Sequence, residues 1–504
     1  MTAAIPGPAP SRRRDARALA WDAGVVAAGA AGPLAFSPFE LWPAAVLSLA
    51  VLFLAWLPAT PGRAARRGWL YGAGMLGTGV FWIHESFQFQ HVALPLAVVL
   101  TGLLVMAMAL YPALTGWLVT RLPAGAAVRL LVLFPVAWTL QEWLRSWLFT
   151  GFPWLMAGYA QVDGPFRGLA PVTGVLGVTA LTALAAGALA ALVARPRRPA
   201  APLAVLGAIA LAGWLAHGVP WTTPTGDTLR VALVQGNVPQ DQKWLPERRR
   251  PTMDHYLNAT RAHGDADLII WPETAIPALY HEVRPFLAGL EEQAKERGQA
   301  LILGIPYLDA GSGLLHNSVV TLAPGERLYH KRHLVPFGEF VPWRDVLEPP
   351  MRALNLPLPT FRPGPQDQAP ARVAGHAVAV SVCYEGAFGE LARRDLPRAE
   401  LLVNLTNDAW FGRSIGPPQH FQMARMRALE SGRPLLRATN TGITAIIGPR
   451  GEIRARIPQF QTAVLRGQVQ PMAGATPYVR WGQWPVVALA LIVLVMAGWR
   501  WRWG

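Results

Sequence analysis

The only cysteine of the 504-residue chain, Cys383, stands in surroundings that suit a reacting group. It follows the apolar run AVSV at the end of a predicted strand and precedes a tyrosine and a glutamate. Strand ends that face loops are where α/β proteins place reacting groups. A thiol is a nucleophile as the thiolate, and because free cysteine titrates near about 8.5, it needs a base beside it. The alternative interpretation is a buried cysteine that only fills space in the core.

Two other predicted strand ends supply the groups that such a thiol needs. Glu273 lies in WPETAIP, directly after an apolar run, and KRHLVPFGEFVP contains Lys331 and Glu339. A carboxylate can act as the base, and an ammonium can stabilise an oxyanion and lower the pKa of a neighbouring thiol. A lone glutamate or lysine is usually a solvated surface charge. Three such groups, each in an aromatic and proline-rich loop, favour a nucleophilic site instead.

Other candidate motifs do not support a metal or cofactor site. His330 and His333 in HKRH have no third ligand nearby, so we expect no zinc site. GPRG lacks the Lys-Ser/Thr of a phosphate-binding loop and is read as a turn. His420 and Arg427 share one face of a predicted helix, and we interpret them as packing or polar surface groups. The sequence therefore predicts no metal and no cofactor.

The composition indicates a membrane protein. Hydrophobic residues make up 52% of the chain and charged residues 15%, whereas soluble domains carry about 25% charged residues. The 21 tryptophans fit anchoring at the bilayer interface. The net charge of +15 fits basic cytoplasmic loops and contact with anionic lipid. No basic patch with interleaved aromatic residues occurs, so we expect no nucleic-acid partner.

Long apolar stretches predict about eight transmembrane helices, since a spanning helix needs about 20 apolar residues. A cleaved signal peptide is the alternative for the first stretch, but the later stretches favour an uncleaved helix. The stretches are 18–36, 41–59, 69–83, 92–120, 130–144, 168–194, 199–219 and 483–499.

The distribution of basic residues predicts the orientation of these helices. With a cytoplasmic N-terminus, every inside segment is basic: SRRRDAR, GRAARR, RLPAGAAVR, ARPRRP and RWRWG. The outside connections FSPFE and HESFQFQH contain no lysine or arginine. This is the pattern of the positive-inside rule. Both termini are therefore expected in the cytoplasm, with the long polar region outside it.

Within the helical part, Glu142 and Arg145 are three residues apart on one predicted helix. Charged residues in a membrane segment are functional candidates by default. Because side chains three residues apart share a helix face, we interpret these two as a structural ion pair near the outer interface.

The polar region alternates short β-rich runs with helical patterns, which predicts an α/β layered sandwich. The turns APGE and GPRGE predict hairpins. The chain divides into a cytoplasmic tail (1–17), a bundle of about seven transmembrane helices (18–219), a catalytic domain (220–482) and a C-terminal helix with a basic tail (483–504). Residues 1–10 are expected to be disordered.

Several longer motifs resemble one family. Glu273, Lys331 and Cys383, in that order, resemble the Glu-Lys-Cys triad of the nitrilase superfamily. The motifs WPETAIP, KRHLVPFGEFVP, VCYEGAF and LTNDAWFG, joined to a bundle of spans, are similar to its membrane-anchored branch, the apolipoprotein N-acyltransferases. GFPWLMAGYAQVDGP and the segment 415–449 also resemble that branch. The resemblance implies a nitrilase-like αββα domain carried by about eight transmembrane helices.

The resemblance also implies a role for each site residue. Cys383 would be the nucleophile, Glu273 the general base and Lys331 the stabiliser of the oxyanion. Glu339 would support Lys331 or the acceptor amine. Further residues match positions on which the family depends or that bear on lipid access. They are Tyr384, Glu385, Trp244 and, with looser spacing, Asn317.

The implied function is N-acylation of the α-amino group of a diacylglyceryl-cysteine apolipoprotein, through a cysteine thioester formed from a phospholipid. The implied place is the bacterial inner membrane, with the catalytic domain in the periplasm. The expected partners are the phospholipid donor, the apolipoprotein and the bilayer, and a monomer is expected. A membrane-anchored amidase that uses water is the alternative. A binding scaffold is disfavoured by the complete triad, and a transporter by the absence of symmetric broken helices.

Overall fold

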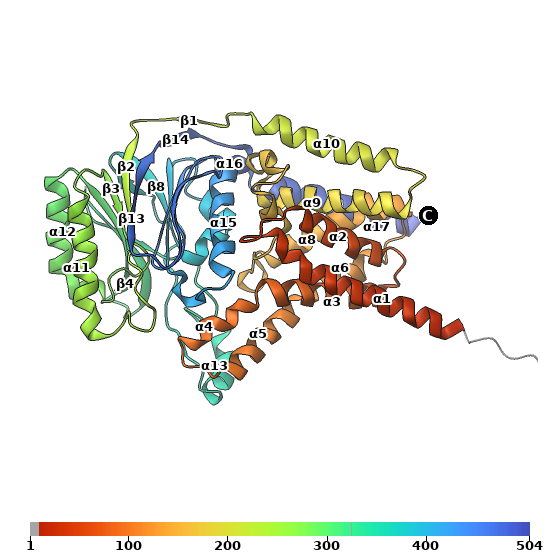
Figure 1. Cartoon of the computed structure of the whole chain (residues 1–504), viewed down its shortest axis with the longest axis horizontal. Helices are drawn as coiled ribbons and strands as arrows, with labels where there is room; N and C mark the ends of the chain where they lie inside the picture. The colour runs from red at the N-terminus through yellow and green to blue at the C-terminus, as the bar shows by residue number, and fades with distance from the viewer. Residues whose placement is uncertain (1–9, 324, 504) are drawn as a thin grey trace, which may run out of the picture.

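The computed structural model describes residues 10–323 and 325–503. It has two halves, a bundle of helices and a β-sandwich, which lie side by side (Figure 1). The tail predicted for residues 1–17 falls largely on residues 1–9, which lie outside the described part of the chain.

The helical half is built from the apolar stretches, and proline opens several of its helices, where the missing N–H costs nothing. Close packing of α1 on α3 requires glycine, because a Cβ at Gly29 would lie 2.2 Å from the carbonyl oxygen of Tyr71. The main helices are α1 (Pro10–Ala31), α2 (Pro43–Trp56), α3 (Pro61–Gly79), α4 (His84–Gln88), α5 (Leu94–Met108), α6 (Leu110–Val119), α7 (Ala126–Val128), α8 (Phe134–Arg145), α9 (Ala170–Ala194), α10 (Ala200–His217) and α17 (Trp484–Trp503).

Five helices in the described residues are long and apolar enough to cross a membrane, and two shorter apolar helices accompany them. The predicted span 69–83 falls in α3, whose first turns carry Arg63, Arg66 and Arg67. The predicted span 41–59 corresponds to α2, which has 14 residues. Each predicted stretch is largely helical, but length and composition do not establish the count of eight.

The predicted ion pair between Glu142 and Arg145 is wrong, although both side chains are buried. Glu142 accepts hydrogen bonds from Trp138, Thr179 and the main-chain N–H of Ala157. Arg145 donates to the carbonyl oxygens of two residues in the loop that follows α8. Within the described residues no ion pair joins the two, because the loop offers each of them closer partners.

Two six-stranded sheets pack face to face in the other half, and leucine, valine and isoleucine side chains from both fill the space between them. The first sheet has the order β13 (Ala463–Val469), β2 (Leu229–Gln235), β3 (Leu268–Ile270), β4 (Ala300–Leu308), β5 (Leu315–Leu322), β6 (Arg327–His330). The second has the order β12 (Ile453–Ile457), β11 (Thr444–Ile447), β10 (Leu435–Thr439), β9 (Leu401–Thr406), β8 (His376–Val382), β7 (Ala371–Val373).

Helices cover the outer faces of both sheets, which gives the expected αββα order of layers. α11 (Pro246–Ala262) and α12 (Arg284–Glu296) cover the first sheet at the end of the molecule away from the bundle (Figure 1). α15 (Gly416–Ser431) covers the second sheet. The shorter helices are α13 (Arg344–Ala353), α14 (Gly389–Arg393) and α16 (Pro477–Trp481).

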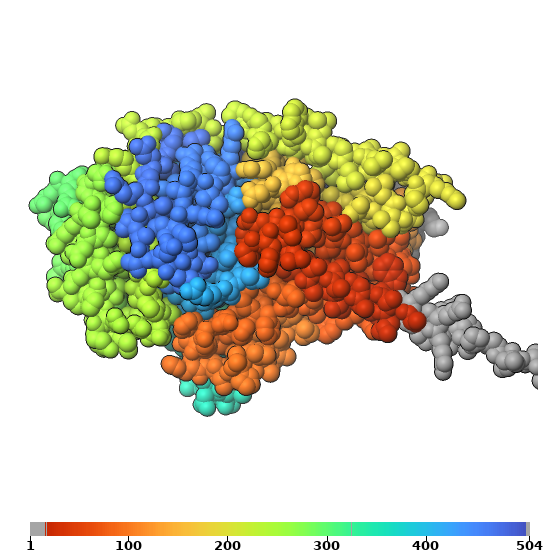
Figure 2. All heavy atoms as spheres, viewed as in Figure 1, coloured from red at the N-terminus to blue at the C-terminus, as the bar shows by residue number. Residues whose placement is uncertain are grey.

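α15 is buried on both sides. Phe421, Ala424 and Ala428 pack on the second sheet, while Met423 and Met426 pack against the helical half. Other α15 residues make polar contacts with the bundle through Trp82, Trp154, Ser37 and Asp163. Figure 2 shows the two halves in contact along a broad front, with no gap on the visible face.

The strand connections agree with the sequence predictions. The turns APGE and GPRGE join antiparallel neighbours, β5 to β6 and β11 to β12. β1 (Thr222–Pro224) pairs with β14 (Met472–Gly474) where the chain enters and leaves the sandwich. Parallel pairing of β2, β3 and β4, and of β8, β9 and β10, aligns the carboxyl ends of these strands.

Candidate active site

Cys383 directly follows β8 and begins the short 3₁₀ turn Cys383–Ala387. Its φ of +48° is in the left-handed region, which is uncommon for a residue other than glycine. Such strain persists only where the surrounding structure enforces it, and it gathers at active sites. Cys383 as a residue is partly exposed, unlike most of the residues around it. A structural cysteine would need neither the strain nor the exposure.

Glu273 is positioned by the end of β3 and by a close approach to β4. Strand β3 ends at Ile270, and a Cβ at Gly304 would lie 2.6 Å from the Glu273 Cα, so β4 needs glycine here. The carboxylate is 8% exposed. Its Oε1 accepts from Asn317 Nδ2 at 2.7 Å and its Oε2 from the Asn407 N–H at 2.8 Å.

Lys331 follows β6 and reaches both carboxylates. Its Nζ lies 2.8 Å from Glu339 Oε2 and 3.9 Å from Glu273 Oε1. Glu339 also accepts from Asn317 and from the Val335 N–H. The Glu339 carboxylate is thus held between Lys331, Asn317 and the Val335 N–H, the arrangement expected of a group that supports Lys331.

Burial and charge together set the proton affinities of the triad. Burial raises the pKa of Glu273, an effect that Lys331 opposes. Burial, together with Glu273, raises the pKa of the Cys383 thiol well above its usual value. Burial lowers the pKa of Lys331, but the two carboxylates outweigh it and the pKa is raised, so the ammonium stays charged. A carboxylate with a raised pKa is a suitable proton acceptor for a thiol.

Glu385 ties the loop of Lys331 to the turn of Cys383. Its Oε1 accepts from the N–H groups of Arg332 and His333, and its Oε2 accepts from the Val382 N–H. The Tyr329 hydroxyl donates to both oxygens at 3.0 Å. Burial raises the pKa of Glu385 to about 7, while Lys331 and the main-chain donors lower it. The predicted supporting role thus has a definite geometry.

Two tyrosines connect the turn of Cys383 to the helical half. The Tyr384 hydroxyl donates to the Gly151 carbonyl at 2.9 Å, and its ring stacks on Trp154. In the opposite direction, the Tyr159 hydroxyl donates to the Ala387 carbonyl at 3.0 Å. The segment GFPWLMAGYAQVDGP therefore supports the site from the helical half of the molecule.

The two predicted substrate-binding residues lie in different environments. Asn317 is buried between Glu273 and Glu339 and donates to both, so it positions the carboxylates. Trp244 is 55% exposed, in the loop that follows β2. The structure brings Asn317 into the triad and leaves Trp244 free at the surface.

Sequence reasoning missed Lys243, the neighbour of Trp244. Its side chain is buried, and its Nζ donates to the Glu273 carbonyl oxygen at 3.3 Å. Burial lowers its pKa to about 8, although Glu273 raises it. The sequence signal was a lysine beside Trp244 in the loop that follows β2, but nothing in the sequence placed that loop against Glu273.

The histidines noted in the sequence do not form a metal site. The His330 ring contacts Ser318 Oγ, and His333 packs against Phe388. Cys383, Asp408 and His420 each bring one ligand atom within 4.8 Å of the others. However, Arg437 donates to Asp408 and also contacts His420 Nδ1, so within the described residues these side chains belong to a hydrogen-bonded network.

The sequence indicates packing or polar surface groups at His420 and Arg427, and the structure places both in the interior rather than at the surface. His420 is 1% exposed, and its Nε2 lies 3.1 Å from the carbonyl oxygen of Cys383. Arg427 is also buried and pairs with Glu430 rather than facing solvent. α15 has no solvent-facing side because the bundle covers it.

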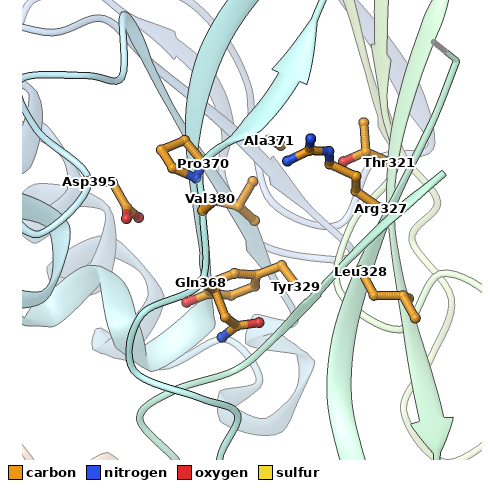
Figure 3. Close-up of a pocket in the computed structure, with 10 residues that line it drawn as sticks. Thr321, Arg327, Leu328, Tyr329, Gln368, Pro370, Ala371, Val380 and Asp395 are labelled. Atoms are coloured by element: carbon orange, nitrogen blue, oxygen red, sulfur yellow. The ribbon is translucent and has the colours of Figure 1, made fainter. Parts of the chain in front are cut away.

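A cavity of about 270 Å³ lies beside Tyr329 (Figure 3). It is lined by Thr321, Arg327, Leu328, Tyr329, Gln368, Ala369, Pro370, Ala371, Val380 and Asp395. None of the three triad residues lines it. The substrates therefore meet Cys383 elsewhere.

Comparisons with known proteins agree with this geometry. The family model of carbon-nitrogen hydrolases matches residues 230–478, and that of the apolipoprotein N-acyltransferase N-terminal domain matches residues 28–188. Among curated proteins, the apolipoprotein N-acyltransferase of Methylococcus capsulatus is 48% identical over 91% of this chain and 92% of its own length. That of Azotobacter vinelandii is 44% identical over 94% of this chain and 93% of its own length.

Among solved structures, a CN-hydrolase superfamily protein from Xanthomonas campestris matches with a TM-score of 0.38 and 20% identity. The match covers 49% of this chain and 91% of that protein.

Proposed function

The chain belongs to the apolipoprotein N-acyltransferase family, and on this premise we propose that Glu273, Lys331 and Cys383 carry out the N-acylation of apolipoproteins. The observation that supports this assignment best is the convergence of three strand ends. β3, β6 and β8 deliver a buried carboxylate, a charged ammonium and a strained, partly exposed cysteine. Tests of these residues open the Discussion.

In the first step, Glu273 takes the proton of the Cys383 thiol, and the sulfur attacks the ester carbonyl of a phospholipid. Lys331 stabilises the oxyanion that forms on the carbonyl oxygen. The ester C–O bond then breaks, and Glu273 returns the proton to the departing oxygen. A lysophospholipid leaves, and the acyl group remains on Cys383 as a thioester.

In the second step, the neutral α-amino group of a diacylglyceryl-cysteine apolipoprotein attacks the thioester. Glu273 takes a proton from the attacking nitrogen, and Lys331 again faces the oxyanion. The C–S bond breaks, the sulfur regains a proton from Glu273, and an amide leaves. Donor and acceptor occupy one site in turn, so ping-pong kinetics follow.

We further propose that both substrates reach the site from one leaflet of the bilayer and that the protein acts as a monomer. Phospholipid and lipid-modified apolipoprotein are both held in the membrane, which favours a catalytic domain fixed to a bundle. Trp244 would contact a lipid on this route, since its ring is exposed beside the buried Lys243. Trp343 is similarly exposed and packs edge-on against Phe149 of the helical half.

The proposed topology has eight spans, with both termini in the cytoplasm and residues 222–480 in the periplasm of a bacterial inner membrane. It divides the chain into the segments 1–17, 18–219, 220–482 and 483–504. The basic segments between the spans support this orientation. The pairing of β1 with β14 supports the point at which the chain leaves and re-enters the membrane.

Reporter fusions test the topology. A reporter that is active only in the periplasm is expected to be active after Gly226, which follows β1, and silent after Pro199, between α9 and α10. The measurement is enzymatic activity in whole cells, normalised to the amount of fusion protein. Activity after Pro199 would reverse the orientation of α10 and rule out the eight-span topology.

A second test separates transfer from hydrolysis. A hydrolase admits water to its acyl-enzyme at once, whereas a transferase must exclude water until the second lipid arrives. Protein given phospholipid alone is expected to accumulate one acyl group on Cys383, seen by mass spectrometry of the intact protein. Little free fatty acid should appear.

Adding a diacylglyceryl-cysteine peptide with a free amine should then discharge the acyl group into an amide. The matched control is the same peptide with an acetylated amine, which cannot attack and should leave the thioester in place. Steady release of fatty acid without any acceptor, as fast as turnover with one, would identify a hydrolase.

A further inference from the structure

The strained backbone of Cys383 needs a restraint that the triad itself does not supply. In the left-handed region a non-glycine residue is held above its preferred conformations. Within the described residues, the side chains of Glu273 and Lys331 hydrogen-bond other side chains and the Asn407 N–H, and not the main chain of Cys383. The carbonyl oxygen of Cys383 is instead approached from α15.

That approach comes from His420. Its Nε2 lies 3.1 Å from the Cys383 carbonyl oxygen, across 37 residues of sequence. Asn404 Nδ2 is the other group near this oxygen, at 3.5 Å, the outer limit of a hydrogen bond. His420 therefore makes the main contact with the carbonyl at the left-handed residue.

The other side of the His420 ring is fixed by two buried charges. Nδ1 lies 3.0 Å from Asp408 Oδ1 and 3.1 Å from Arg437 Nη2, and Arg437 also donates to Asp408 Oδ2. All three side chains are at most 1% exposed. The ring of Trp154 packs against the imidazole from the helical half. These contacts restrict the imidazole on every side.

The hydrogen-bond roles follow from the chemistry of the partners. A carbonyl oxygen only accepts, so Nε2 must carry a hydrogen. Burial and the charge of Arg437 lower the pKa of His420, against the effect of Asp408, which favours the neutral ring. In the neutral ring with its hydrogen on Nε2, Nδ1 accepts from Arg437, and Asp408 orients the ring through its own ion pair with Arg437 rather than by a hydrogen bond to Nδ1. The donor to Cys383 is therefore present without a protonated imidazole.

We propose that His420, oriented by Asp408 and Arg437, is a positioning residue that holds the Cys383 carbonyl and so keeps the thiol directed at Glu273 and Lys331. The proposal rests on Cys383 being the nucleophile. His420 takes no proton from the thiol in this scheme, because its Nε2 is engaged with the main chain. A misplacement of about 1 Å at a reacting atom can cost about 100-fold in rate.

The test compares variants that keep or lose the donor. In His420→Gln the amide nitrogen can take the place of Nε2, and in His420→Phe no donor remains. We expect acyl-enzyme formation from phospholipid to be about 10- to 100-fold slower in His420→Phe, with KM for the donor nearly unchanged. His420→Gln should stay within several-fold of the wild-type rate. The pH midpoint of acylation should be the same in all three proteins.

The control on the same helix is Gln422→Ala, which removes a buried contact to the Ser37 N–H but none to the site. Its acylation rate should match the wild type, and melting of the purified proteins shows that each variant is folded. If His420→Phe does not fold, His420→Asn is used instead. The asparagine amide can occupy the position of Nδ1, but it is too short to reach the Cys383 carbonyl oxygen.

The positioning role would be overturned by a wild-type rate of acyl-enzyme formation in His420→Phe. It would also be overturned if His420→Gln and the donor-free variant lost the same factor in that rate. A shifted pH midpoint would make His420 a base instead. The rate at which iodoacetamide alkylates Cys383 is measured in parallel, because it reports the thiol without any lipid. A wild-type protein that never forms an acyl-enzyme, yet shows the expected order of alkylation rates, would refute the proposed function and leave the positioning role intact.

Discussion

Replacement of Cys383 by alanine is expected to abolish acyl transfer. The variant lacks the only thiol of the chain, so no thioester can form. Removal of the nucleophile from a triad costs on the order of 10⁴-fold or more in rate. The measurements are amide formation with both substrates and the acyl-enzyme mass with phospholipid alone, and both should fall to background.

The same substitution should leave the protein folded. Alanine is a non-glycine residue like cysteine, so the left-handed backbone is equally strained in both, and the lost sulfur leaves a partly exposed site rather than a sealed cavity. Ser381→Ala, a change of similar size two residues earlier on β8, is the control and should retain activity. Transfer at a near-normal rate by a folded Cys383→Ala protein would return Cys383 to a structural role.

Replacement of Glu273 by glutamine is expected to have the second-largest effect. Glutamine keeps the shape and can still accept from the Asn407 N–H, but it cannot take a proton from the thiol. General-base catalysis contributes about 10²- to 10⁴-fold, and the rate of thioester formation should fall by that amount. Single-turnover acylation followed by mass spectrometry measures it.

The proposed role of Glu273 also predicts the direction in which the acylation rate changes with pH. Glu273 is a base only when it is deprotonated, and burial raises its pKa, so wild-type acylation should fall as pH is lowered through that raised pKa. In Glu273→Gln this limb should disappear. The residual rate should rise only at alkaline pH, because the pKa of the thiol is itself raised by burial. Glu282→Gln, at a surface ion pair with Arg249, is the control. An unchanged acid limb in Glu273→Gln would exclude Glu273 as the base.

The triad could be predicted because its signals are local. Glu273 and Cys383 each follow a short apolar run, and Lys331 follows the strand RLYH, which pairs antiparallel with β5. The turns APGE and GPRGE were equally readable, since each joins two adjacent strands.

Strand β10 could not be predicted because its pattern contains a buried charge. Arg437 lies in the middle of LLRAT, and arginine in a central strand is unusual. The structure compensates this charge with Asp408 and Asn404 from elsewhere in the chain. The role of His420 could not be predicted for a similar reason, because its contact partner, Cys383, is distant in sequence and lies on another element.

The number of transmembrane helices is a second feature that hydropathy alone could not predict. α3 combines three arginines with an apolar second half, and α2 is apolar but short. Hydropathy favours the apolar part of each stretch, but α2 is too short for a spanning helix and the three arginines of α3 make that helix too charged. The predicted orientation of the helices rests on the unequal distribution of basic residues between the loops. Neither hydropathy nor helix length measures this distribution.

The double burial of α15 has a consequence for the biogenesis of the protein. A sandwich released from the bundle would expose Met423, Met426 and Leu429 to water, together with polar groups whose partners are in the bundle. Exposed apolar patches of this kind lead to aggregation. The first ten helices precede the sandwich in the chain, so the surface that receives α15 is synthesised before α15 itself. Chain order thus makes the helical half the template on which the sandwich matures, and a fragment lacking the helical half becomes a substrate for proteases rather than a smaller enzyme.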